Sequence, residues 1–349
     1  MDKVLMKGNE AIAEAAIRAG CRHFFGYPIT PQTEISAYMA RRMPKIGGTF
    51  LQAESEVAAI NMVYGAAGAG VRAMTSSSSP GISLKSEGIS YIAGADLPCV
   101  IVNIVRAGPG LGGIQPAQSD YFQAVKGGGH GDYRMIVVAP SSIQEIVDST
   151  FLAFDLADKY RMPVMLMGDG MLGQMMEPVA FPDTTGVKLP EKEWATTGTK
   201  KMRKPNIINS LYIQPDELEA LIKNRWKKYI EIEQNEVRFE AEGTEDAEII
   251  LVAYGATARI VKAAIKKARE NGIKAGLIRP ITLWPFPSDV ISAAAKKVKA
   301  ILCVEMSMGQ MVEDVRLSAA GACPVHFYGR TGGVVPIPAD VYDEIRRYV

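Results

Sequence analysis

Apolar and polar positions alternate along the first half of the chain as short apolar runs and longer segments with helical periodicity. Nearly continuous apolar runs at 98–105, 135–139 and 163–167 are typical of parallel strands buried on both faces. Shorter strands are expected at 22–26 and 72–76, and helices at 9–19, 32–43, 56–70, 82–93 and 142–159. This alternation predicts a doubly wound α/β domain built on a parallel sheet.

The periodicity is lost after Pro178. Residues 181–215 contain several prolines and a basic cluster at 200–204, which predicts a long surface connection. Residues 216–237 then read as one charged amphipathic helix, either solvated or clasping another subunit. A second α/β pattern follows, with strands at 249–254, 275–278, 300–304 and 325–327 and helices at 257–271, 288–297 and 309–320. We therefore expect domains at 1–180 and 246–349, joined by a linker and helical arm at 181–245.

Composition narrows the classes of function. A chain of 349 residues suggests two domains, and a hydrophobic content of 48% is ample for two cores. The net charge of +1 gives no reason to expect nucleic acid or a membrane surface as the partner. No apolar run approaches the roughly 20 residues of a spanning helix, and the N-terminus lacks the apolar core of a signal peptide. A cytoplasmic location is expected.

The cysteines and histidines do not predict a metal site. Cys21, Cys99, Cys303 and Cys323 are far apart, form no C-x-x-C pair, and are expected to be buried small apolar residues. Because iron–sulfur spacing is absent, any cluster would belong to another chain. The three histidines are too scattered for a local zinc motif.

The segment Tyr27-Pro28-Ile29-Thr30-Pro31-Gln32-Thr33 joins a predicted strand to a helix expected to begin near Pro31. Ligands of open α/β sheets bind outside the carboxyl ends of the strands. A proline in the first helical turn leaves the other N–H groups of that turn free for an anion, and the Thr30 hydroxyl adds a donor. These groups suit a carboxylate, although an ordinary N-cap threonine is the alternative.

Two charged residues, Glu56 and Arg106, also lie at the ends of predicted elements. Glu56 begins a helix rich in Ala and Gly, where apolar neighbours favour a carboxyl group that shares a proton near neutral pH. The alternative is a helix-start glutamate stabilised by the helix dipole. Arg106 ends a buried strand, where an unpaired guanidinium is costly and its planar fork suits a carboxylate. A structural salt bridge is the alternative there.

Three loops are further candidates. The turn at 76–81, with Ser78, Ser79, Pro80 and Gly81, can line a polar pocket or serve as a flexible turn with an N-cap. The glycine-rich segment at 108–113 lacks the Lys-Ser/Thr pair of a P-loop. His130 lies in a glycine loop. It could donate a proton near a reacting group or make a structural hydrogen bond, and both interpretations are open.

Together these segments resemble the α chain of the thiamine-diphosphate-dependent 2-oxoacid:ferredoxin oxidoreductases, and within that family the branched-chain (3-methyl-2-oxobutanoate) type. The resemblance implies a thiamine pyrimidine-binding-like domain at 1–180 and a domain similar to the transketolase C-terminal domain at 246–349. It implies that Glu56, rather than Glu54, engages N1′ of the cofactor, with Ser78, Ser79, Pro80 and Gly81 beside it. Thr30 and Arg106, flanked by Pro28 and Ile29, would hold the substrate carboxylate.

The resemblance also implies partners. Gly168-Asp169-Gly170 resembles the start of a magnesium and diphosphate motif, but its asparagine is missing where the sequence reads Ala195-Thr196-Thr197-Gly198. The diphosphate and Mg²⁺ should therefore be held by a β chain, and 4Fe-4S clusters by partner chains that include γ and ferredoxin-like δ subunits. Coenzyme A would take the acyl group and ferredoxin the electrons. The same subunit acting on pyruvate or 2-oxoglutarate, and a non-catalytic scaffold that binds a nucleotide or coenzyme A, remain as alternatives.

Overall fold

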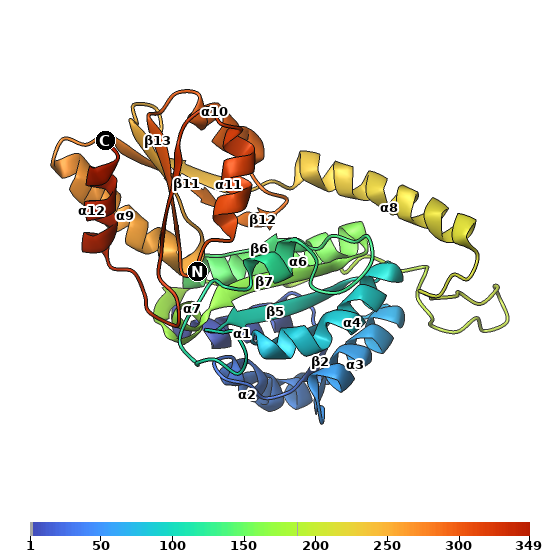
Figure 1. Ribbon diagram of the computed structural model, residues 1–349. Coiled ribbons are helices and arrows are strands. Elements are labelled where there is room, and N and C mark those ends of the chain that lie inside the picture. The colour runs from blue at the N-terminus through green and yellow to red at the C-terminus, as the bar shows by residue number, and fades with distance from the viewer. Residues whose placement is uncertain (1–2, 187) are drawn as a thin grey trace.

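A seven-stranded sheet forms the centre of the N-terminal half of the molecule (Figure 1). The computed structural model describes residues 3–186 and 188–349. From edge to edge, the strands are β12 (Thr282–Trp284), β6 (Ile136–Val138), β7 (Pro163–Asp169), β5 (Cys99–Val105), β4 (Ala73–Ser77), β2 (His23–Gly26) and β3 (Thr49–Gln52). All neighbouring pairs are parallel except β12 with β6.

Helices cover both faces of this sheet, which explains why its central strands β4 and β5 are buried along their whole length. Every residue of β5 is buried. Because crossovers between parallel strands are right-handed, α3 and α4 lie on one face and α2 and α6 on the other, with α1 packed against α2 and α6. The helices here are α1 (Gly8–Arg18), α2 (Thr33–Arg42), α3 (Glu56–Gly68), α4 (Pro80–Gly94), α5 (Tyr121–Val125), α6 (Ile143–Tyr160) and α7 (Gly170–Gln174), with a 3-10 turn at Met43–Ile46. The predicted doubly wound fold is confirmed.

The second sheet has the strand order β14 (Val325–Gly329), β13 (Ala300–Glu305), β10 (Ile249–Val252), β11 (Ala275–Pro280) and β9 (Phe239–Glu242). Four of these strands are parallel, and β9 is an antiparallel edge. Its helices are α9 (Gly255–Glu270), α10 (Ser288–Ala295), α11 (Met311–Ala319) and α12 (Pro338–Arg347). One strand from this part of the chain, β12, pairs with β6 and so extends the first sheet.

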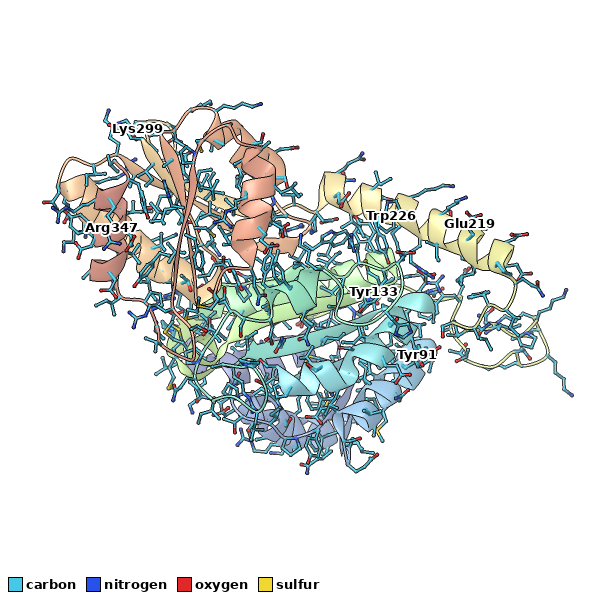
Figure 2. All side chains as sticks on the ribbon, in the orientation of Figure 1. Tyr91, Tyr133, Glu219, Trp226, Lys299 and Arg347 are labelled. Carbon is cyan, nitrogen blue, oxygen red and sulfur yellow. The ribbon has the colours of Figure 1, made fainter. Side chains whose placement is uncertain are left out.

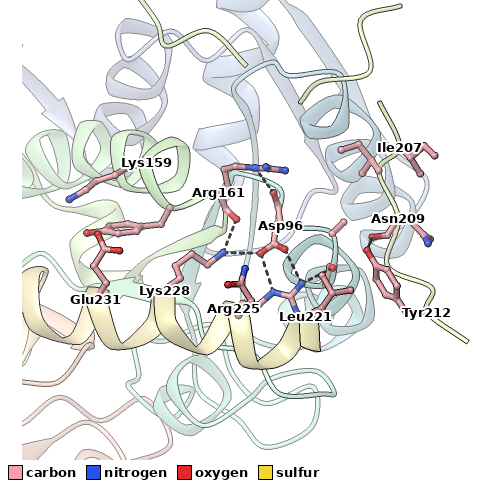
Figure 3. Close-up of a pocket in the computed structure, with 15 residues that line it drawn as sticks. Asp96, Lys159, Arg161, Ile207, Asn209, Tyr212, Leu221, Arg225, Lys228 and Glu231 are labelled. Carbon is pink, nitrogen blue, oxygen red and sulfur yellow. Dashed lines mark hydrogen bonds and ion pairs between the residues drawn. The ribbon is translucent and has the colours of Figure 1, made fainter. Parts of the chain in front are cut away.

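A long connection and one long helix link the two halves. Residues 181–214 contain neither helix nor strand among the described positions, and α8 (Pro215–Asn235) then runs back from the outer end of this connection toward the second sheet as a single helix (Figure 1). Arg225 anchors α8 to the first domain through two hydrogen bonds to the Asp96 carboxylate, at 3.0 and 2.9 Å, and Lys228 adds a third at 2.8 Å (Figure 3). These contacts surround a cavity of about 520 Å³ between α8 and the end of α4.

The structure contains some strands and helices that the sequence pattern did not predict. The missed strands are short: β3, β9, β12, and the pair β1 (Val4–Lys7) and β8 (Met176–Val179), which form a separate two-stranded sheet. A strand of four residues with a polar edge carries little periodic signal, and the pairing partner lies far away in sequence. The helices α5, α7 and α12 were also missed. Within the described residues, no helix is long and apolar enough to cross a membrane.

The four cysteines are free and buried, as predicted. Burial raises the pKa of Cys21 and of Cys99 to about 12, so these thiols stay protonated at neutral pH. Within the described residues, no group of three or more His, Cys, Asp and Glu side chains is arranged to hold a metal ion.

Candidate active site

The strand order brings the predicted site segments to one edge of the first sheet. Strands β5, β4, β2 and β3 are consecutive neighbours and parallel, so their carboxyl ends meet at the same edge. Arg106 follows β5, the serine turn follows β4, the segment at 27–33 follows β2, and Glu56 comes shortly after β3. This is the edge at which ligands bind in open α/β sheets.

Arg106 is a buried cation held by backbone carbonyls. Its side chain donates from Nη1 to the carbonyl oxygen of Thr30 at 3.0 Å and from Nη2 to that of Leu111 at 3.1 Å. The residue is only 7% exposed, and Nε is buried without a partner. Among the described residues, no carboxylate pairs with it, so the structural salt bridge considered as an alternative is not formed. A buried guanidinium with an unused donor fits an anionic ligand.

The segment at 27–33 differs from its prediction in one respect. Helix α2 begins at Thr33 rather than near Pro31, because the N–H of Gln32 already donates to the carbonyl of Ile29 in a turn. Pro31 is therefore not in the first helical turn, and the argument that it leaves free N–H groups there was wrong. Thr30 and Pro28 are exposed, and Ile29 is half-buried. The contact of Thr30 with Arg106 uses its carbonyl, which leaves its hydroxyl free to face a ligand.

The serine turn is strained and held by hydrogen bonds. Ser79 adopts φ 25°, which is unfavourable for a residue with a side chain. Its N–H donates to Oδ1 of Asn103, its hydroxyl donates to the carbonyl of Arg106, and its Oγ accepts from the N–H of Arg106. Strain held in this way is typical of functional sites, and here it couples the turn directly to the arginine.

Glu56 is buried at the start of α3, whereas Glu54 is exposed. The N-cap is Ser55, whose side chain accepts from the N–H of Ala58, so the helix does not need the Glu56 carboxylate as its cap. Among the described residues, none donates a hydrogen bond to that carboxylate. Gly81, in the first turn of α4, gives it room, because a Cβ there would lie 2.7 Å from Oε1 of Glu56 and 2.0 Å from Oγ of Ser77.

Unpartnered polar atoms gather in the same region. Buried oxygens without a hydrogen-bond partner include Oγ of Ser77, Oγ of Ser78 and Oγ1 of Thr75. Orphaned buried hydroxyls are costly, and a run of them on one strand and its turn suggests a ligand or a partner chain that supplies the missing bonds. The hydroxyls, the free Nε of Arg106 and the carboxylate of Glu56 fit the polar edges of a heterocyclic cofactor and the carboxylate of its substrate.

Sequence reasoning missed three residues that build this site. Gln32, fully buried, accepts from the Ser76 hydroxyl at 2.5 Å and donates to the Tyr27 carbonyl, which ties the 27–33 segment to β4. Asn103 holds Ser79, as described above. Lys85, on α4, is fully buried, and its Nζ lies 3.3 Å from the carbonyl oxygen of Glu56. Of the three, Asn103 carried the clearest signal, because it is a polar residue inside an apolar run, whereas Gln32 and Lys85 have polar neighbours in the sequence.

Two other candidates lie outside this cluster. His130 is exposed and packs edge-on against Tyr91, which lies near the end of α4 opposite the serine turn (Figure 2). Ten residues of helix separate Tyr91 from Gly81, or roughly 15 Å, so the expectation of a proton donor beside the cluster is not supported within this chain. Asp169 caps α7 by accepting from the N–H groups of Met171 and Leu172, a structural role that agrees with the interpretation of Gly168-Asp169-Gly170 given above.

Comparison with known proteins agrees with this geometry. Residues 14–242 match the family model of the pyruvate flavodoxin/ferredoxin oxidoreductase thiamine diphosphate-binding domain. Residues 247–341 match pyruvate:ferredoxin oxidoreductase core domain II. The chain thus belongs to the thiamine-diphosphate-dependent 2-oxoacid:ferredoxin oxidoreductase family.

Individual relatives cover nearly the whole chain. It is 52% identical over 342 residues to the ketoisovalerate oxidoreductase subunit VorB of Methanothermobacter marburgensis, covering 98% of this chain and 97% of that protein. It is 38% identical to the 2-oxoglutarate synthase subunit KorA of Methanothermobacter thermautotrophicus, covering 99% and 98%.

Solved structures agree on the fold. The chain is similar to a 2-oxoglutarate:ferredoxin oxidoreductase from Magnetococcus marinus solved with 2-oxoglutarate, coenzyme A and succinyl-CoA bound, with a TM-score of 0.89 and 27% identity. That likeness covers 99% of this chain and 65% of the longer solved chain. A split-gene transketolase, at a TM-score of 0.60 and 14% identity, shares the fold alone.

Proposed function

We propose that this chain is the α subunit of a complex that oxidatively decarboxylates 3-methyl-2-oxobutanoate. In the complete reaction the 2-oxo acid and coenzyme A give acyl-CoA and CO₂, and the two electrons released reduce ferredoxin. The observation that carries this assignment is the 52% identity to a ketoisovalerate oxidoreductase subunit over nearly the full length of both chains, since ketoisovalerate is the same acid.

The residues of the cluster have separate tasks. When bound, thiamine diphosphate supplies a carbon nucleophile for the 2-oxo group. The buried Glu56 carboxylate would accept and return a proton at N1′ of the aminopyrimidine. Arg106, with Nε unused, would hold the substrate carboxylate, and the free Thr30 hydroxyl would add one hydrogen bond.

The loop after Arg106 supports a branched apolar substrate. Leu111 and Ile114 are 83% and 57% exposed, and the backbone carbonyl of Leu111 is bonded to Arg106 itself. Residues 107–116 contain no Lys, Arg or His. A 2-oxoglutarate site would be expected to hold a second cation for the distal carboxylate, and this loop offers methyl groups instead.

The remaining parts of the reaction would come from other chains. A β chain would hold the diphosphate and Mg²⁺, because the Asp169 carboxylate in this chain is occupied as a helix cap. Partner chains, including γ and ferredoxin-like δ subunits, would carry the 4Fe-4S clusters, since all four cysteines here are buried and far apart. Coenzyme A would be a co-substrate, as it is bound in the Magnetococcus enzyme.

The test is a substrate comparison with the chain assembled with the products of neighbouring genes. We expect kcat/KM for 3-methyl-2-oxobutanoate to exceed that for 2-oxoglutarate and pyruvate by at least tenfold. The isolated chain should be colourless and inactive. The competing candidate is 2-oxoglutarate, favoured by the 38% identity to a 2-oxoglutarate synthase subunit, and a preference for that acid would overturn the assignment. If the chain purifies without partner chains and shows no thiamine-dependent activity when any partner is added, it would instead be a scaffold.

A further inference from the structure

Lys85 is a buried lysine for which packing gives no explanation. Its exposed fraction is zero, and it is among the largest fully buried side chains of the chain. Lysine is almost never buried unless its charge is paired, because desolvating an ammonium is costly. Among the described residues, the hydrogen-bond acceptor of Nζ is the carbonyl oxygen of Glu56, at 3.3 Å.

The packing of α3 on α4 directs this ammonium to the start of α3. Gly81, Lys85 and Gly88 lie at i, i+4 and i+7, so they share one face of α4. A Cβ on Gly88 would lie 2.5 Å from Ile60, and one on Gly81 would lie 2.7 Å from Oε1 of Glu56, so the two helices approach closely at both glycines. Lys85 lies between these two glycines on α4, and its Nζ contacts the backbone carbonyl of Glu56.

The electrostatic surroundings of Lys85 are dominated by burial and by one carboxylate. Glu56 is the charged group that acts on Lys85 among the described residues. Burial lowers the pKa of Lys85 to about 8, against the opposing effect of Glu56, so the amine is still mainly charged at neutral pH. The N-terminus of α3 carries a positive partial charge of its own, which makes a second cation there unfavourable unless a carboxylate balances it.

We infer that Lys85 is a positioning residue for Glu56: its ammonium fixes the first residue of α3 through the backbone carbonyl and places a positive charge beside the residue that carries the carboxylate. The inference rests on the proposed function for its use in catalysis. The electrostatic link between the two side chains can be measured without it.

The first measurement follows the carboxyl group directly in the full chain. With ¹³C-labelled glutamate, the Glu56 signal is assigned as the one lost in Glu56→Gln, and its titration midpoint is read by NMR. Lys85→Met has nearly the same volume without the charge, and Lys85→Gln keeps a hydrogen-bond donor without the charge. Both should move the midpoint upward by about one pH unit or more, because a nearby cation favours the ionised carboxylate.

A matched control is Lys192→Met. Lys192 is also largely buried, but it pairs with Asp158 at 2.6 Å, away from Glu56. Its loss should leave the Glu56 midpoint unchanged. If Lys85→Met and Lys85→Gln leave the midpoint where it is in the wild type, the electrostatic role is wrong. If only Lys85→Met moves it, the hydrogen bond rather than the charge is responsible, and the charge role is again wrong.

The second measurement uses the assembled complex and separates this inference from the proposed function. The circular dichroism band of the imino tautomer of bound thiamine diphosphate is followed against pH. We expect its midpoint to rise in Lys85→Met and the band to vanish in Glu56→Gln. Loss of the band in Glu56→Gln with an unshifted midpoint in Lys85→Met would overturn the role of Lys85 alone. A normal band in Glu56→Gln would instead overturn the proposed role of Glu56.

Discussion

Nη1 of Arg106 donates a 3.0 Å hydrogen bond to the backbone carbonyl oxygen of Thr30, 76 residues away in the sequence. A carbonyl orients the guanidinium without neutralising it, so the positive charge remains for a ligand. Because the acceptor belongs to the backbone, substitution of the Thr30 side chain should leave Arg106 in place. The two residues can therefore be tested separately.

The first prediction concerns this pair. In the assembled complex, Arg106→Ala should raise the substrate KM strongly, Arg106→Lys should recover part of the loss, and Thr30→Val should cost less, about 1–2 kcal/mol. An ammonium keeps the charge but not the two-pronged geometry. The measurement is steady-state kinetics with several 2-oxo acids, since all carry the same carboxylate.

Two outcomes would contradict these roles. A changed preference among substrate side chains at constant KM would assign Arg106 to the side-chain pocket. An unaffected Thr30→Val enzyme would show that Thr30 contributes only its backbone carbonyl.

The second prediction concerns the two glutamates at the start of α3. Glu56→Gln should leave assembly intact and lower turnover by roughly 10²-fold or more, the scale of lost acid–base assistance. Glu54→Gln is the matched control, because Glu54 is exposed two residues away and should have much less effect. Turnover is measured with saturating cofactor. Equal losses in the two variants would remove the distinction that burial predicts.

The third prediction concerns the close approach at Gly81. A Cβ there would lie 2.0 Å from Oγ of Ser77 and 2.7 Å from Oε1 of Glu56, so Gly81→Ala should displace the carboxylate. We expect a loss of about 1–3 kcal/mol in the free energy of unfolding, typical of overpacking, and at least a tenfold loss of turnover. Denaturant unfolding and steady-state kinetics measure the two effects.

Gly65→Ala in α3 is the control for that experiment. A Cβ at Gly65 meets no atom within 4 Å, and alanine is the better helix former, so stability should be equal or higher. If Gly81→Ala behaved like Gly65→Ala, the turn would be loose enough to yield, and the close packing around Glu56 would not be essential.

The fourth prediction is a pH dependence of stability. The pKa of Lys85 is lowered from 10.5 to about 8 in the folded chain, so between these values the unfolded chain binds more protons. The contribution of Lys85 to the free energy of unfolding therefore rises with pH across that window, by roughly 3 kcal/mol in total, and is lowest below pH 8. Lys85→Met lacks this rise.

The measurement is the difference in free energy of unfolding between wild type and Lys85→Met at several pH values from 7 to 10.5. The difference removes the contributions of tyrosines and other lysines that titrate in the same range. The free energy of unfolding of the variant should exceed that of wild type most at pH 7, and this excess should decrease as pH rises. A difference that is constant with pH would mean that Lys85 titrates normally.

The sequence by itself determined the architecture and the main chemical groups of the site. Nearly continuous apolar runs such as the one that became β5 are typical of strands buried on both faces, and their alternation with helical periods favours a doubly wound sheet. The local context of Arg106, at the end of such a run, favoured a carboxylate ligand, with a structural salt bridge as the alternative. Whether Glu56 or Glu54 faces the site rested on resemblance, and burial of Glu56 now agrees with it.

Only the tertiary structure decided which groups act together. The order β5-β4-β2-β3 is set by crossovers and by pairing between distant segments, and no local pattern specifies it. The same order brings Gln32 to Ser76 and Lys85 to Glu56, and it leaves His130 at the far end of α4. Lys85 reads as an ordinary helix lysine in sequence, because the cost of burying its charge exists only once α3 and α4 have packed around it.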